Sequence, residues 1–107
     1  KTLKGSVQHN VTLVQGTSSH TVRPGDYTIA FDGTGTSDPA VYLPMGAAVG
    51  TTYIIKDYKG TANSNNIAVG GPSINIDGTT FIFIDNAYSA ITVQCMGNDT
   101  WAVISKF

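Results

Sequence analysis

The chain has 107 residues, a formal net charge of −1 and only 12% charged residues, with seven aspartates and no glutamate. This length suits one domain, and the near-zero net charge argues against binding to nucleic acid or to an anionic membrane. Ile, Val, Thr and Gly are frequent and runs of helix-forming residues are missing, so we expect an all-β fold. No apolar run approaches the ~20 residues of a transmembrane helix, and we expect no membrane insertion.

Short runs of alternating or continuous apolar residues indicate about nine to ten strands. In chain order, the runs are residues 7–14, 20–22, 27–31, 41–43, 53–57, 67–69, 74–76, 80–84, 90–95 and 101–104. The turn signals between them include Arg23-Pro24-Gly25-Asp26 and the hairpin dipeptide Asp77-Gly78. Gly97-Asn98-Asp99 is expected to join the last two strands into a hairpin.

Turns that recur every 8–12 residues or so favour an antiparallel, jelly-roll-like β-sandwich. The first part of the chain is less specific than the rest. We therefore expect residues 1–20 to form an N-terminal arm or connecting strand, and residues 21–107 to form the sandwich domain.

Two of the predicted strands are apolar on both faces, Phe81–Ile84 and Ala102–Ile104. A two-sheet domain has only one inner face per sheet, so the second face of each strand needs another cover. A copy of the same chain is the simplest cover, and we expect self-association.

A series of motifs resembles the C-terminal β-sandwich domain of bacteriophage tail fibres and tailspikes. These motifs are Leu43-Pro44, Val49-Gly50, Tyr53–Asp57, Gly60, Ala62, Asn66-Ile67, Ile76-Asp77-Gly78, Tyr88, Ala90–Val93, Gly97 and Trp101–Ile104. The resemblance covers roughly residues 22–107. It implies a homotrimer at the distal end of a fibrous or β-helical virion protein, outside the cell. It further implies trimer locking, recognition of bacterial surface polysaccharide or lipopolysaccharide, or both.

The residues do not assemble a catalytic or metal-binding motif. All seven aspartates lie at predicted turns or strand ends, where Asp commonly caps the backbone. His9 and His20 accompany no nucleophile motif, and the single cysteine, Cys95, is expected to be a buried free thiol. Trp101 is expected to anchor the core. We therefore expect a protein that is not an enzyme and needs no metal or cofactor.

Exposed tyrosines beside amides and carboxylates are the best candidates for sugar contact. Tyr58 lies beside Asp57 and precedes the loop Asn63–Asn66, from which we select Asn65. Tyr88 follows Asp85 and Asn86 in a second turn. The predicted ligand-binding residues are Asp57, Tyr58, Asn65, Asp85 and Tyr88.

Two other functions stay open. The same β composition and exposed tyrosines fit a monomeric carbohydrate-binding module of a secreted enzyme. A purely structural trimer that decorates a fibre or capsid, without binding sugar, is the third possibility.

Overall fold

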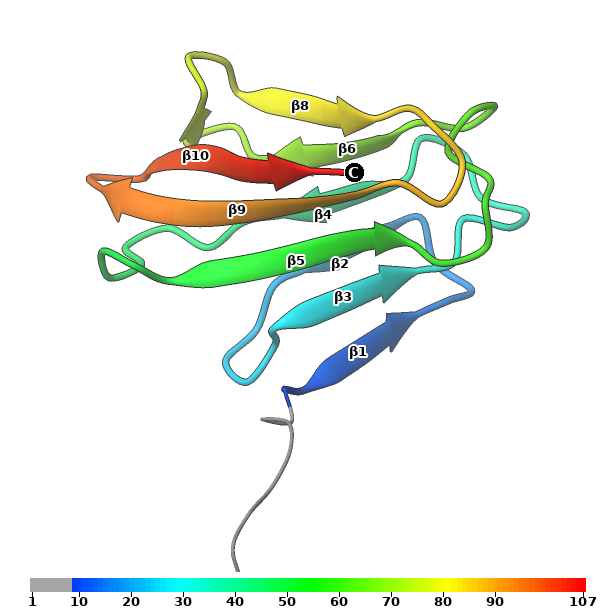
Figure 1. The fold of residues 1–107 in the computed structure, drawn as a ribbon, viewed down its shortest axis with the longest axis horizontal. Helices are drawn as coiled ribbons and strands as arrows, with labels where there is room; N and C mark the ends of the chain where they lie inside the picture. Colours follow the sequence, from blue (N-terminus) through cyan, green and yellow to red (C-terminus); the bar gives the residue numbers. More distant parts are fainter. Residues whose placement is uncertain (1–8) are drawn as a thin grey trace, which may run out of the picture.

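The computed structural model describes residues 9–107, which contain ten strands and no helix, arranged in two layers (Figure 1). The strands are β1 (Val11–Val14), β2 (Ser19–Thr21), β3 (Thr28–Phe31), β4 (Ala40–Tyr42), β5 (Thr52–Asp57), β6 (Ile67–Gly70), β7 (Asn75–Ile76), β8 (Phe81–Ile84), β9 (Ala90–Gly97) and β10 (Thr100–Lys106). Sheet A has the order β1-β3-β5-β9-β10-β7, and sheet B has the order β2-β4-β6-β8.

The first six strands form a β-solenoid, because the chain passes alternately from one sheet to the other. β1, β3 and β5 stack in parallel in sheet A. β2, β4 and β6 stack in parallel in sheet B. Each coil therefore consists of one strand from each sheet, and the three coils are β1–β2, β3–β4 and β5–β6.

The predicted antiparallel, jelly-roll-like sandwich is wrong, although the strands lie close to the predicted runs. An alternating run has a period of two in parallel and antiparallel sheets alike, so it does not reveal its partner. Parallel neighbours need a long crossover connection. In this fold, the connection between two parallel neighbours contains a strand of the opposite sheet. The frequent turns therefore join strands of different sheets and do not join hairpin partners.

Antiparallel strands close the far end of the solenoid. β8 pairs with β6, β9 with β5, and β10 with β9, whereas β7 runs parallel to β10. Asp77 and Gly78 adopt positive φ angles of 50° and 86°, which are the angles that a hairpin dipeptide of this kind favours. Their turn forms a single β-bridge, between Ile76 and Thr79. The strand before the turn, β7, belongs to sheet A, and the strand after it, β8, belongs to sheet B. The predicted β9–β10 hairpin does form, with positive φ at Asn98 and Asp99.

The core lies between the two sheets and consists of branched aliphatic side chains around three large rings. Fully buried aliphatic residues include Ile29, Val41, Ile55, Ile67, Val69, Ile76, Ile91 and Val93. Trp101 is buried as predicted and stacks on Tyr53 with ring centroids 5.8 Å apart. Cys95 is a buried free thiol, which confirms that prediction. Burial of each of the aliphatic side chains named above stabilises the folded state by roughly 1.5–3 kcal/mol.

At the first coil, β1–β2, polar contacts replace the apolar packing of the core. The Asp26 carboxylate accepts a hydrogen bond from Thr12 Oγ1 at 2.6 Å and lies 2.8 Å from His20 Nε2. It also accepts the backbone N–H of Arg23 at 3.0 Å, within the predicted turn. Burial alone would raise the pKa of the Asp26 carboxyl, but these hydrogen bonds outweigh burial and lower its pKa below the ordinary value.

Residues 1–8 of the predicted N-terminal arm lie outside the described residues. Of the remaining arm, β1 pairs with β3 along its whole length, and β2 begins before residue 20 and pairs with β4. Both strands therefore belong to the two-sheet body that the structure describes.

Candidate ligand-binding groove

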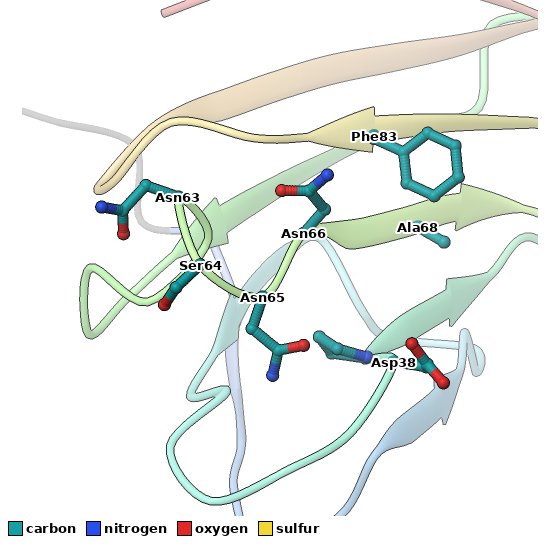
Figure 2. Close-up of a pocket in the computed structure, with 8 residues that line it drawn as sticks. Asp38, Asn63, Ser64, Asn65, Asn66, Ala68 and Phe83 are labelled. Atoms are coloured by element: carbon teal, nitrogen blue, oxygen red, sulfur yellow. The ribbon is translucent and has the colours of Figure 1, made fainter.

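The outer face of sheet B carries a groove of about 440 Å³ (Figure 2). Ala68 of β6 forms the floor of the groove, and the strand register places it between Ala40 of β4 and Phe83 of β8. Its lining residues are Asp38, Pro39, Asn63, Ser64, Asn65, Asn66, Ala68 and Phe83. The volume falls within the range of about 300–1,000 Å³ that is usual for small-molecule sites.

Phe83 forms the apolar wall of the groove because of the alternation along β8. Ile82 and Ile84 pack on the core, so Phe81 and Phe83 point outward. The Phe83 side chain is 51% exposed and stands beside the small side chain of Ala68 (Figure 2). An exposed ring over a flat, small-residue floor offers an apolar surface that a ligand can cover.

The loop between β5 and β6 supplies three amide side chains to the groove. The loop is a compact turn in which the N–H groups of Ser64 and Asn65 both donate to the Thr61 carbonyl. Asn65 Nδ2 donates to the Thr36 carbonyl at 2.8 Å, which ties this loop to the preceding coil. Asn63 and Asn66 are exposed, so their donors and acceptors are available to a ligand.

Asp38 closes the groove on the side of β4. It adopts φ = 51° at the end of the polar loop that follows β3, and its side chain is exposed. The adjacent Pro39 carbonyl accepts the Ala68 N–H at 2.9 Å, which fixes this loop end against the floor. Within residues 9–107, Asp38 is the only charged side chain in the lining. The groove therefore suits a neutral ligand with hydroxyl groups and an apolar face, and disfavours an anion.

The structure separates the five predicted ligand-binding residues into three places. Asn65 lines the groove, and it alone of the five does so. Asp85 lines a different cavity of about 380 Å³, between β8 and β10, together with Asp77 and Lys106. Asp57, Tyr58 and Tyr88 gather at the carboxyl end of β5.

Asp57 lies inside the protein. It is 0% exposed, and its carboxylate accepts the backbone N–H groups of Gly60, Thr61, Ala62 and Tyr88 at 2.9–3.2 Å. Four internal donors leave its oxygens well satisfied without a ligand.

Tyr58 and Tyr88 are exposed beside lysines. Lys59 Nζ lies 5.3 Å from the centroid of the Tyr58 ring, and Lys56 Nζ lies 5.7 Å from that of Tyr88. Tyr88 has φ = 63°, and its ring covers Gly60, where a Cβ would collide with it. Each of the two rings therefore lies beside a lysine, and neither ring lines the groove.

Phe83 and Asp38 are the groove residues that sequence reasoning missed. The apolar run Phe81–Ile84 by itself predicts only a surface for self-association. The period-two alternation contains a better signal, because it places Phe81 and Phe83 together on one face. Asp38 gives no such signal, since only the folded coil brings it next to Ala68.

No protein-family model matches the chain, and no curated protein matches it. Residues 9–107 contain no group of three or more His, Cys, Asp or Glu residues able to hold a metal ion. The part of the chain that the structure describes has no helix with the length and hydropathy needed to span a membrane.

Proposed function

We propose that this chain is a non-catalytic, sugar-binding module from the distal end of a bacteriophage tail fibre or tailspike. It acts as a homotrimer on the outside of the virion and binds bacterial surface polysaccharide or lipopolysaccharide. The observation that carries the proposal is the exposed Phe83 ring beside the Asn63–Asn66 amides and the Asp38 carboxylate on one sheet face.

The groove chemistry supports a carbohydrate ligand. A sugar ring has an apolar face of C–H groups, which stacks on an aromatic ring, and an edge of hydroxyls, which bind amides and carboxylates. Phe83 provides the first contact, and Asn63, Asn66 and Asp38 provide the second. A shallow site of this kind binds weakly, and three copies on one particle compensate through avidity.

The outer face of sheet A supports self-association. The side chains on it include Val11, Leu13, Thr28, Ala30, Thr52, Ile54, Lys56, Ala90, Thr92, Gln94, Met96, Ala102 and Ser105. Lys56 is the one charged residue in this set, and its Nζ donates to the Tyr88 carbonyl. A broad, flat and nearly uncharged face has the composition of a subunit interface.

The solenoid is compatible with a position at the end of a β-helical protein. Among residues 9–107, β1 and β2 form one edge of their sheets, and a further parallel coil would stack on this edge. The antiparallel strands β8, β9 and β10 close the opposite end.

Binding to isolated bacterial polysaccharides, measured by isothermal titration calorimetry, tests the sugar-binding part of this proposal. We expect Phe83→Ala to weaken binding by about tenfold, equivalent to about 1.4 kcal/mol. Phe107→Ala is the matched control, because Phe107 is exposed but lies outside the groove. Wild-type protein that binds none of a broad polysaccharide panel, or that binds equally well without Phe83, would contradict the proposal.

A monomeric carbohydrate-binding module is the second candidate, and one observation favours it. Phe81, Phe83 and Tyr42 all lie on the outer face of sheet B, which gives this sheet the aromatic platform expected of such modules. The groove serves both candidates equally. The oligomeric mass separates them, because only the fibre module requires the face of sheet A to be covered.

A further inference from the structure

A second cavity, of about 550 Å³, lies on the same outer face of sheet B. Its lining residues are Tyr42, Leu43, Met45, Gly71, Pro72, Ser73, Ile74 and Phe81. None of these side chains carries a charge, and the hydroxyls of Tyr42 and Ser73 are their only polar side-chain groups. The second cavity is therefore apolar where the groove beside Phe83 is lined by amides.

The two cavities are the two ends of one strip. The register gives two adjacent rows across the sheet, Ala40–Ala68–Phe83 and Tyr42–Gly70–Phe81. These rows are two residues apart along the strands, or about 6.8 Å. A single extended ligand can therefore contact both rows.

Gly70 keeps the strip open between its aromatic walls. The rings of Tyr42 and Phe81 meet edge to face at 6.2 Å, with an interplanar angle of 73°. Gly70 lies between these two residues in the register and has φ = 151°, and a Cβ there would collide with the Thr80 carbonyl oxygen. No side chain can fill this position, so the floor stays flat.

We propose that the strip binds a neutral oligosaccharide in which one sugar lies against Phe83 and a neighbouring sugar puts a methyl group into the apolar cavity. This inference rests on the proposed function. The shared chemistry is the methyl group, which a 6-deoxy sugar or an acetylated sugar supplies. A hydroxyl in the same place would lose its water partners in an apolar site, which is unfavourable.

Matched pairs of disaccharides test this inference. One pair differs only in a terminal D-fucose against D-galactose, and the other in a terminal N-acetylglucosamine against glucose. We expect the wild-type protein to prefer a methyl-bearing member by roughly tenfold or more, the discrimination usual for one methyl group in an apolar pocket. Saturation-transfer NMR and calorimetry measure the preference.

Two variants locate the preference. Met45→Asp places a charge in the cavity at an exposed position, and Phe81→Ala removes one wall. We expect both to abolish the preference, measured as the ratio of the affinities for the two members of each pair. Val49→Asp is the matched control, because Val49 is exposed and lies outside both cavities and outside the strands of sheet A.

The possible outcomes separate this inference from the proposed function. Equal affinity of the wild type for both members of each pair overturns the methyl pocket but leaves sugar binding intact. A preference that survives in Met45→Asp and Phe81→Ala also overturns it. Absence of binding to every sugar overturns both proposals.

Discussion

Asp57 holds together two loops at the carboxyl end of β5. Its buried carboxylate accepts four backbone N–H groups, those of Gly60, Thr61, Ala62 and Tyr88. In Asp57→Asn an NH2 group replaces one acceptor oxygen and leaves buried donors unpaired. We expect the free energy of unfolding to fall by about 3 kcal/mol, as measured by urea denaturation.

Asp85→Asn is the control for this measurement, since Asp85 is exposed just after β8. A change at such a position should stay within about 0.5 kcal/mol. If Asp57→Asn unfolds at the same urea concentration as Asp85→Asn, the four hydrogen bonds of Asp57 do not stabilise these loops.

Asp26 should make the first coil sensitive to acid. Its hydrogen bonds lower its pKa in the folded state, whereas the unfolded chain has the ordinary value of about 3.9. The unfolded state therefore binds the proton more readily, so stability is fully present above the unfolded pKa and is lost as pH falls through it towards the folded pKa. We expect the unfolding free energy of the wild type to drop more steeply below about pH 4 than that of Asp26→Asn.

Thr12→Val provides an intermediate case. It removes the 2.6 Å hydrogen bond to Asp26 but keeps the carboxylate and the contact with His20. The acid dependence of Thr12→Val should lie between those of the wild type and Asp26→Asn. Identical pH profiles for wild type and Asp26→Asn would show that Asp26 does not couple folding to acid.

At the level of residues, the sequence predicted side-chain chemistry better than side-chain position. Tyr58 and Tyr88 are exposed as expected, and Asn65 reaches the groove. Asp57 could not be placed, because an Asp that caps a loop and an Asp that meets a ligand look the same at the end of a strand. Gly60, Thr61 and Ala62, which donate to Asp57, lie within five residues of it, whereas the N–H of Tyr88 comes from a distant part of the chain and could not be foreseen.

Gly70 controls the pairing of β6 with β8. It has φ = 151°, and a Cβ at this position would collide with the Thr80 carbonyl oxygen of the neighbouring segment. Gly70→Ala therefore combines backbone strain with a clash against main chain. We expect a loss of about 3 kcal/mol or more in unfolding free energy, measured by thermal and urea denaturation.

Gly16→Ala isolates the backbone contribution. Gly16 has φ = 74°, but a Cβ there would meet nothing within 4 Å. The cost should be only about 1–2 kcal/mol, the penalty of a left-handed conformation. Equal losses for the two variants would mean that the β6–β8 junction relaxes around an added methyl group.

At the level of elements, strands and tight turns were predictable but strand partners were not. The period-two runs located most strands, and turns form at Asp77-Gly78 and at Asn98-Asp99, both with positive φ. The first of these turns does not make an extended hairpin, because its two strands enter different sheets. Pairing depends on contacts between residues far apart in the sequence, and local alternation carries no information about them.

The whole molecule presents two outer sheet faces of different character. Sheet B carries aromatic rings, amides and the two cavities, and this mixture suits a small ligand. Sheet A carries aliphatic and threonine side chains with Lys56 as the one charge in its outward-facing set, and it has no aromatic platform. This division predicts that binding and assembly use opposite faces, so that a trimer built through sheet A leaves its grooves open.

Light scattering behind size exclusion tests this assembly. We expect the wild-type protein to have about three times the 11.2 kDa mass of one chain. Val11→Asp and Leu13→Asp put a carboxylate on the outer face of sheet A at positions 62% and 47% exposed, so they should shift the mass towards the monomer without unfolding it. A buried, unpaired charge at an interface commonly costs several kcal/mol.

Val49→Asp is the matched control, because Val49 is 74% exposed in a loop outside sheet A. It should remain a trimer and so exclude a general effect of added negative charge. If the wild type is a monomer, the uncharged face of sheet A has no partner copy, and the monomeric carbohydrate-binding module becomes the better explanation of the groove. If the wild type is a trimer that Val11→Asp and Leu13→Asp do not dissociate, the interface lies elsewhere, and the aromatic face of sheet B is the next surface to test.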